Sequence, residues 1–278
     1  MMVCGLSLPR SNVANVTRPA KTMYIPPMDR QTAYQLRSCR VEVLHEDEWL
    51  LVLSKPAGLL VIPDRYDRSK QHLQGLLTSN GMPAWIVHRL DRDTSGVIIV
   101  ARTAESHANI NAQFEGREVG KQYLAVCRGS SEKERATIDL PLAPHRHVEG
   151  RMVVDRKNGK ECVTELRIAE RFDGYVAVEA RPRTGRTHQI RVHLAESGLP
   201  LIADPLYGDG APFFLSQIKR SFRAGELDEK PLLSRTALHA QSITIRHPQT
   251  LSELTVEAPL PKDIRSVLQA LRKYAPLR

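Results

Sequence analysis

The chain alternates short runs of apolar, β-branched residues with polar stretches that are rich in turn-forming residues. The strongest run is 97–100, Val-Ile-Ile-Val, which is typical of a buried strand. It follows directly on a charged loop, residues 88–96, that ends in Thr-Ser-Gly. Because these residue types favour tight turns, the pattern predicts a rigid loop that displays Asp91 just before the strand.

Other apolar segments predict further strands and helices by their spacing. Strands are predicted at 41–45, 50–53, 97–100, 122–127, 137–140, 151–155, 162–168, 175–180, 238–246 and 254–257. Helices are predicted at 73–77, 104–114, 187–196 and from 261 past 271, with a linker at 209–234 that holds a candidate helix around Lys219, Arg220 and Arg223. Thr103 and Thr187 are candidate N-caps. The Asn-Gly pair at 158–159 predicts a hairpin between the strands at 151–155 and 162–168.

The order of these elements, with many strands and few helices between them, predicts an α+β fold. We expect a mixed, mostly antiparallel β-sheet core with flanking helices and a central cleft for an active site. A chain of 278 residues is long enough to bury a sizeable core. We assign residues 41–278 to one domain.

Residues 1–40 differ from the rest of the chain. They hold six basic residues against the single acid Asp29, together with four prolines and no visible period. This composition predicts a basic, disordered N-terminal extension, and we favour a role in holding an RNA. Two other interpretations stay open: a transit peptide in the acid-free stretch before Asp29, or a true start at Met23 or Met28.

The chain has a formal net charge of +9, and arginine is abundant. A basic excess of this size favours an anionic partner, with nucleic acid first and a membrane surface second. The alternative is a basic surface that serves solubility alone. No apolar run approaches the length needed to cross a bilayer, so we expect no membrane partner.

The four cysteines are scattered along the chain and form no C-x-x-C pair, which argues against a zinc site. A chain of this length does not need disulfides for stability. We interpret the cysteines as reduced thiols and expect a cytoplasmic location.

Three stretches combine charged residues with glycine or proline next to predicted strands or helices. They are 46–58 (EDEWLLVLSKPAG), 88–96 (HRLDRDTSG) and 183–194 (RTGRTHQIRVHL), which continues to 202–208 (IADPLYG). These stretches, with weaker matches at 121–126, 238–240 and 247–248, resemble the motifs of the RluA-type RNA pseudouridine synthases, in the same order. The resemblance covers residues 41 to about 275. Ala203 stands where many members of that family carry glycine, a departure that we expect to affect packing rather than chemistry.

The resemblance implies that the domain at 41–278 is catalytic and isomerises uridine to pseudouridine in an RNA. The uracil leaves C1′ through N1 and rejoins through C5. The resemblance further implies that Asp91 is the catalytic carboxylate and that Tyr123 lies over the target base and serves in proton transfer. Arg191 would pair with Asp91, and Arg89 would enter the space left by the flipped nucleotide. This chemistry needs no redox group or metal, so we expect no cofactor.

The residue types suit these roles. A carboxylate can stabilise or attack a cation-like sugar, and an adjacent guanidinium favours the ionised carboxylate. Arg191 stays protonated and can hold both carboxylate oxygens. Arg89 lies two residues from Asp91, so an extended loop would aim both side chains to the same side. Tyr123 offers a ring for stacking and a hydroxyl for a proton, although an ordinary strand tyrosine is the alternative.

The candidate substrate-binding residues are His88, Arg89, Arg92, Thr94, Lys55, Arg183, Arg186 and His188. The stretch 181–194 contains no acid, which favours a phosphate-binding patch over a solvated basic face. His188 and His193 are five residues apart, unlike the four-residue spacing of a zinc pair, so we interpret them as structural or RNA-contacting. Lys55 is either an RNA contact or an ordinary surface lysine.

We therefore predict a pseudouridine synthase, an isomerase that acts as a monomer on a structured rRNA or tRNA. The alternative is a non-catalytic RNA-binding protein or RNA chaperone on the same scaffold. A glycosidase that pairs Asp91 with Asp93 fits less well, because Arg89 and Arg92 make the loop basic. The sequence leaves open the RNA class, the modified position, and whether Asp91 attacks C1′, attacks C6 or assists elimination.

Overall fold

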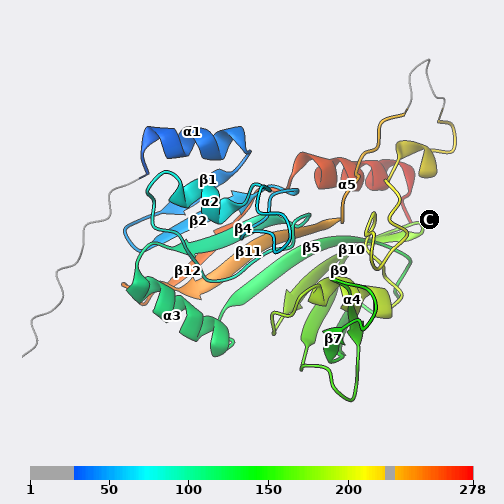
Figure 1. Cartoon of the computed structure of the whole chain (residues 1–278). Coiled ribbons are helices and arrows are strands. Elements are labelled where there is room, and N and C mark those ends of the chain that lie inside the picture. The colour runs from blue at the N-terminus through cyan, green and yellow to red at the C-terminus, as the bar shows by residue number, and fades with distance from the viewer. Residues whose placement is uncertain (1–27, 223–228, 278) are drawn as a thin grey trace, which may run out of the picture.

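The computed structural model describes residues 28–222 and 229–277, and in this part of the chain one curved, ten-stranded sheet carries the fold (Figure 1). The strand order is β1-β2-β4-β11-β5-β10-β9-β6, with β12 beside β11 and β3 beside β4. Strands β4 and β11 pair in parallel, and the other pairs in this sheet are antiparallel. The predicted α+β fold with a mixed, mostly antiparallel sheet is therefore confirmed.

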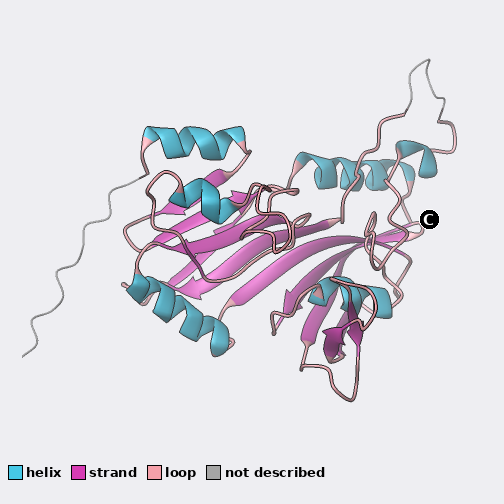
Figure 2. Ribbon diagram, in the orientation of Figure 1, coloured by secondary structure: helices cyan, strands magenta, loops and turns pink. Residues whose placement is uncertain are grey.

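The elements agree closely with the predicted ones along most of the chain (Figure 2). The strands of the main sheet are β1 (Glu42–Glu46), β2 (Leu50–Lys55), β3 (Trp85–Ile86), β4 (Ser95–Ala101), β5 (Gly120–Arg128), β6 (Arg135–Asp139), β9 (Val163–Phe172), β10 (Tyr175–Pro182), β11 (Leu238–Arg246) and β12 (Glu253–Glu257). A separate two-stranded sheet consists of β7 (Leu142–Pro144) and β8 (Met152–Val154). The helices are α1 (Arg30–Ser38), α2 (Leu73–Thr78), α3 (Ala104–Glu115), α4 (Gln189–Glu196) and α5 (Lys262–Tyr274), with a 3₁₀ turn at Leu215–Gln217.

Helices cover both faces of the sheet. Figure 1 shows α1, α2 and α5 above the sheet and α3 and α4 below it. Leu36 of α1 packs in one apolar cluster with Leu51 of β2, whereas Ile110 of α3 packs with the alternate residue Leu50. Because successive strand residues point to opposite faces, a strand that is covered on both, such as β2 or β4, must be apolar at consecutive positions.

This two-sided burial explains the run Val-Ile-Ile-Val at 97–100. Ile98 and Val100 lie in the cluster beneath α1 and α2, whereas Val97 and Ile99 lie in the cluster with α3. All of β4 is buried. The strand that follows the charged loop is thus a rigid support for it.

Gly96 fixes the start of β4 against β11. It pairs with Ala240 in the parallel ladder and has a φ of 119°. A Cβ atom at this position would lie 2.1 Å from the carbonyl oxygen of Ala240, so only glycine fits. The neighbouring Ser95 Oγ lies 3.0 Å from His239 Nδ1 across the same pair.

The predicted hairpin between 151–155 and 162–168 is wrong. Strand β8 pairs with β7 instead, and β9 pairs with β6 and β10. A turn does form here, with the Gly159 N–H donating to the Asp155 carbonyl at 2.8 Å, but it is not the predicted two-residue hairpin turn, because neither Asn158 nor Gly159 has a positive φ. After this turn the chain pairs with Leu142, which exchanges backbone hydrogen bonds with Lys160. The prediction missed β7, a short strand that begins next to Pro141 and ends at Pro144, since proline is rare inside strands.

The predicted N-terminal extension needs a correction at its end. Residues 30–38 form α1, in which Thr32 and Leu36 are buried at helical spacing and the Asp29 carboxylate accepts from the Thr32 N–H at 2.7 Å. The basic side chains of this segment lie on the exposed face of an amphipathic helix. A count of charges alone does not indicate this helix, because it ignores the spacing of the buried residues. The part of the prediction that concerns residues 1–27 lies outside the described residues.

Two helix predictions also change. In the described part of the linker, a 3₁₀ turn at Leu215–Gln217 stands where a helix was proposed. Lys219 and Arg220 follow that turn, and Arg223 lies outside the described residues. Thr187 is not the cap of α4, because His188 is the N-cap residue and has a left-handed φ of 54°. Among residues 28–222 and 229–277, no helix combines the length and apolar character that a membrane span requires.

Candidate active site

Asp91 lies in the loop between β3 and β4, as predicted, and its surroundings hold the loop backbone in place. The Thr94 N–H donates to the Asp91 carbonyl at 3.2 Å, which closes a tight turn. The Arg92 carbonyl accepts from the Gly58 N–H at 2.8 Å and from the Lys55 Nζ at 3.1 Å. The loop is therefore tied to the segment that follows β2.

Arg191, on α4, connects Asp91 to a buried carboxylate. Its Nη1 lies 3.4 Å from Asp91 Oδ2, while its Nε and Nη2 donate to Asp204 at 2.7 and 2.8 Å. Asp204 is 0 % exposed and also accepts from the backbone N–H groups of Leu206 and Tyr207. Burial raises the pKa of Asp204, but the hydrogen bonds and charge of Arg191 outweigh it and keep that pKa below its ordinary value. Asp204 thus fixes Arg191 so that its remaining Nη1 points at Asp91.

His188 and Tyr207 complete this wall of the site. The Tyr207 hydroxyl accepts from the Met152 N–H at 2.8 Å and lies 2.9 Å from His188 Nδ1. His188 Nε2, the other ring nitrogen, lies 3.8 Å from Asp91 Oδ2. Burial lowers the pKa of His188 despite the nearby Asp91, so this ring is neutral at pH 7.

Tyr123 enters the same site from β5. It pairs with Ala240 and Ala180 in the ladders on its two sides, and it lines a cavity together with Asp91. Burial, and next the charge of Asp91, raise the pKa of Tyr123 above its ordinary value of 10. The phenol is therefore neutral at physiological pH and is able to donate a hydrogen bond.

Two adjoining cavities meet at Asp91. The first has a volume of about 620 Å³ and the second of about 630 Å³. Both are lined by Arg89, Leu90, Asp91, Thr94, Thr187, His188 and Arg191. Tyr123 and the 182–186 segment line only the first, and the 60–65 segment lines only the second. The carboxylate of Asp91 is thus accessible from two sides, and six Arg and Lys side chains against two carboxylates line the first cavity.

Most predicted substrate-binding residues gather around these cavities. Arg89, Thr94, Arg183, Arg186 and His188 line the first cavity, and Arg92 lines the second. Arg89 is exposed, and its Nη2 lies 3.4 Å from Thr187 Oγ1. Arg183 donates to Glu165 at 2.8 Å through its Nε and remains largely exposed.

Lys55 does not have the predicted role of contacting RNA. Its side chain is 0 % exposed, and its Nζ donates to the carbonyls of Pro56, Leu59 and Arg92 at 2.8 to 3.1 Å. All three N–H donors of the ammonium are engaged, so none is left for a phosphate. Burial lowers the pKa of Lys55 to about 7. Its position indicates that it holds the Asp91 loop rather than the substrate.

His88 also differs from its predicted role. Its Nε2 accepts from the Ile99 N–H at 2.9 Å, and its ring lies 5.1 Å from the ring of Phe114. Burial lowers the pKa of His88 to about 3, so the ring is neutral and offers no charge to a phosphate. His88 therefore serves as a packed wall of the first cavity.

The sequence reasoning assigned no role to Asp204, Tyr207 or Lys121, although all three lie in stretches quoted for the resemblance. Lys121 lines the first cavity, and its Nζ donates to the Thr184 carbonyl at 3.1 Å. Ala203 has a left-handed φ of 55°, so the departure from glycine bears on backbone strain next to Asp204 as well as on packing. An aspartate or an alanine in the sequence does not by itself indicate a buried ion pair or a left-handed backbone.

No metal centre is apparent in residues 28–222 and 229–277, where no group of three or more His, Cys, Asp or Glu side chains is arranged to hold a metal ion.

Comparisons with known proteins agree on one family. A family model described as RNA pseudouridylate synthase matches residues 49–196. The ribosomal large subunit pseudouridine synthase D of Xanthomonas campestris is 37 % identical over 257 residues, which cover 88 % of this chain and 74 % of that protein. The protein of the same name from Pseudomonas aeruginosa is 37 % identical over 251 residues, covering 88 % and 76 %. The structure of human RNA pseudouridylate synthase domain containing 4 superimposes with a TM-score of 0.65 and 26 % identity, over 87 % of this chain and 97 % of that one.

The chain therefore belongs to the RNA pseudouridylate synthase family, and the predicted RluA-type resemblance is confirmed. Among its relatives are ribosomal large subunit pseudouridine synthases D, which are isomerases, so the predicted enzyme class is confirmed as well.

Proposed function

We propose that this protein converts specific uridines of large-subunit ribosomal RNA to pseudouridine, with Asp91 as the catalytic carboxylate. One observation carries the proposal. The Asp91 carboxylate lies where a basic cavity meets a second cavity, 3.4 Å from the Nη1 of an arginine that a buried aspartate holds in place. Rigid placement of this kind is what a reactive group needs, because small displacements lower catalytic rates steeply.

The reaction breaks the N1–C1′ bond of uridine, forms a C5–C1′ bond and moves one proton from C5 to N1. It involves no net oxidation. A carboxylate beside C1′ stabilises positive charge that develops on the sugar or forms a bond to it. The neutral phenol of Tyr123 lines the same cavity, and we assign it to stacking on the uracil and to proton exchange.

A uridine within a structured RNA must leave its stack to reach a carboxylate inside a cavity. Arg89 is exposed at the junction of the two cavities, two residues from Asp91. We assign its planar guanidinium to the space that the extruded nucleotide leaves. The remaining cationic residues around the first cavity, Arg183 and Arg186 among them, are assigned to RNA phosphates.

Ribosomal RNA is preferred over transfer RNA because the relatives that cover most of this chain carry the name ribosomal large subunit pseudouridine synthase D. Action on that RNA fits the expected cytoplasmic location. We keep the monomer as the expected form of the active protein.

The experiment uses large-subunit RNA transcribed with [5-³H]uridine. Formation of pseudouridine replaces the C5–H bond, so each turnover releases one tritium to water. We expect the purified protein to release tritium from a small number of sites and sequencing to locate them. Release from transfer RNA but not from this RNA would refute the ribosomal substrate, and release from neither would favour the non-catalytic RNA-binding alternative.

A further inference from the structure

An exposed ion pair lies at the edge of the first cavity and joins two segments that are distant in the sequence. Arg117 follows α3, and Glu161 precedes β9. The Nη1 and Nη2 of Arg117 donate to the two carboxylate oxygens of Glu161 at 2.9 and 2.7 Å. The two side chains are 49 % and 55 % exposed, so solvent and ligands reach both partners.

The surroundings of Glu161 are cationic. The Arg186 Nε donates to the Glu161 backbone carbonyl at 3.1 Å. Arg117, Lys121 and Arg186 all line the cavity that also contains Asp91. The hydrogen bonds and charge of Arg117 hold the pKa of Glu161 below its ordinary value, so its carboxylate is charged at neutral pH.

We propose that the Glu161 carboxylate occupies the place of a phosphate, and that Arg117 together with Arg186 and Lys121 forms a subsite for one phosphate of the substrate RNA. Binding of RNA then exchanges the Arg117–Glu161 pair for an Arg117–phosphate pair. This inference rests on the proposed function, since it takes RNA as the substrate of the same cavity.

The geometry supports the exchange. A guanidinium donates two parallel hydrogen bonds to a carboxylate and to a phosphate in the same way, so Arg117 needs little rearrangement. An exposed ion pair contributes little to stability, so its opening costs little. The phosphate also interacts more strongly than the carboxylate with a cationic surface, because a polyanion releases counterions when it binds.

Substitutions of the two partners distinguish this subsite from a purely structural ion pair, because the subsite predicts opposite effects. Arg117→Gln removes a phosphate ligand, and we expect KM for the large-subunit RNA transcript to rise about 10-fold with the slope of log KM against log salt reduced by about one. Glu161→Gln removes the competing charge, and we expect KM to fall about 3-fold or more. The kcat of both variants stays within about 2-fold of wild type, since neither residue contacts Asp91.

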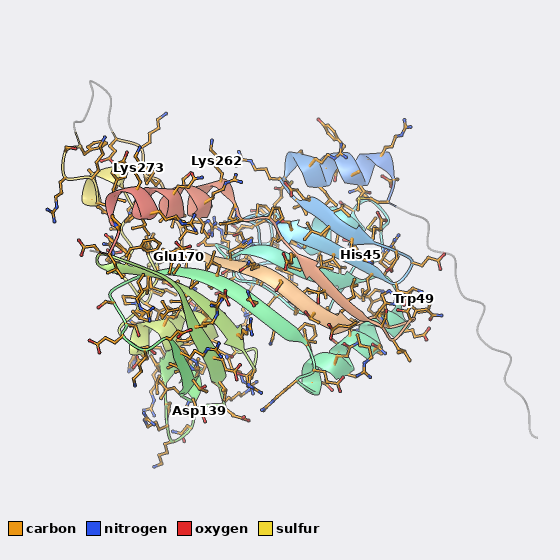
Figure 3. All side chains as sticks on the ribbon, turned by 180° about the vertical axis from the view of Figure 1, so that it is seen from behind. His45, Trp49, Asp139, Glu170, Lys262 and Lys273 are labelled. Carbon is orange, nitrogen blue, oxygen red and sulfur yellow. The ribbon has the colours of Figure 1, made fainter. Side chains whose placement is uncertain are left out.

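The pair Arg272–Glu170 is the matched control. The Arg272 Nε donates to Glu170 at 2.9 Å, and the side chains are 53 % and 38 % exposed. This pair joins α5 to β9, and Figure 3 labels Glu170 on β9. Neither residue lines either cavity. We expect Arg272→Gln and Glu170→Gln to leave KM unchanged.

A rise in KM, or no change, for Glu161→Gln would overturn the inference and indicate a structural pair. Urea unfolding of each variant verifies that it is folded in the assay, and Arg117→Ala, which also removes the charge, replaces Arg117→Gln if the latter is not. The inference and the proposed function fail separately. Wild-type turnover with unchanged KM in both variants overturns only the subsite, whereas absence of wild-type turnover on the RNA overturns the proposed function.

Discussion

The buried pair between Arg191 and Asp204 supports Asp91 indirectly, and the substitution Asp204→Asn tests it. Asparagine keeps the shape of the side chain but directs an NH₂ group either at the guanidinium or at the backbone N–H groups that the carboxylate now satisfies. The positive charge of Arg191, whose side chain is 8 % exposed, then loses its buried counter-charge. Removal of one partner of a buried ion pair costs about 3–5 kcal/mol, and we expect a loss of that size in the free energy of unfolding.

The same change has a catalytic effect. Without Asp204, the guanidinium of Arg191 is free to turn toward Asp91, which is the one other carboxylate that it contacts among the described residues. A displacement of about 1 Å at a reacting group lowers the rate about 100-fold, and we expect a reduction of that order in single-turnover tritium release.

The assays are urea unfolding and single turnover, both under conditions in which the variant is folded. Glu170→Gln, which alters an exposed bidentate pair, is the control and should change the free energy of unfolding by less than about 1 kcal/mol. Because the pKa of Asp204 is lowered in the folded protein, its contribution is complete above the ordinary value of 3.8 and is lost as pH falls through the lower folded value. The stability of the variant should therefore depend less on pH in that acid range. Wild-type stability and rate in Asp204→Asn would refute the reasoning.

Two further substitutions test Lys55, which holds the Asp91 loop, and Lys121, a cationic residue of the first cavity. Lys55→Met leaves three carbonyls without their donor, so we expect a loss of about 2–4 kcal/mol in the free energy of unfolding and a fall in kcat. The control is Lys70→Met, at an exposed lysine. A kcat of Lys55→Met equal to that of wild type would refute the role of Lys55 in anchoring the Asp91 loop. Since the pKa of Lys55 is lowered to about 7, the unfolded wild type binds more protons than the folded protein between pH 7 and 10.5, so the deficit of the variant should grow as pH rises through that range. Burial lowers the pKa of Lys121 to about 8, so its ammonium loses its charge as pH rises from 7 to 9, and KM of the wild type for RNA should rise. Lys121→Gln should lack this rise. The same rise in the variant would contradict the assignment of Lys121 to an RNA phosphate.

The sequence predicts the strands and the Asp91 loop well, because both depend on local pattern. The run at 97–100 is apolar at every position since helices cover both faces of β4, and the glycine before it is required by the close approach of Ala240. The pairing of β7 with β8 was not predictable in this way. It depends on the pairing of Lys160 with Leu142, which the local pattern of apolar and polar residues does not indicate.

Some site residues could likewise be identified from local motifs, whereas the roles of others depend on the tertiary structure. Asp91, Tyr123 and Arg191 were identified from motifs, and the structure brings all three to the wall of one cavity. The burial of Lys55 could not be predicted, because its three acceptors come from both the 56–59 segment and the Asp91 loop. Asp204 lies 13 residues after Arg191, and only the tertiary structure shows that the two side chains form a bidentate pair.

The central claim is that the carboxylate of Asp91 performs the chemistry while other residues hold the RNA. The most direct measurement compares wild type and Asp91→Asn on the same tritiated large-subunit RNA, with tritium release and equilibrium RNA binding measured side by side. We predict that Asp91→Asn releases no tritium and binds the RNA with an affinity within about 3-fold of wild type, because the amide keeps the shape of the side chain but not its charge. Tritium release by Asp91→Asn at a rate near that of wild type would contradict the claim.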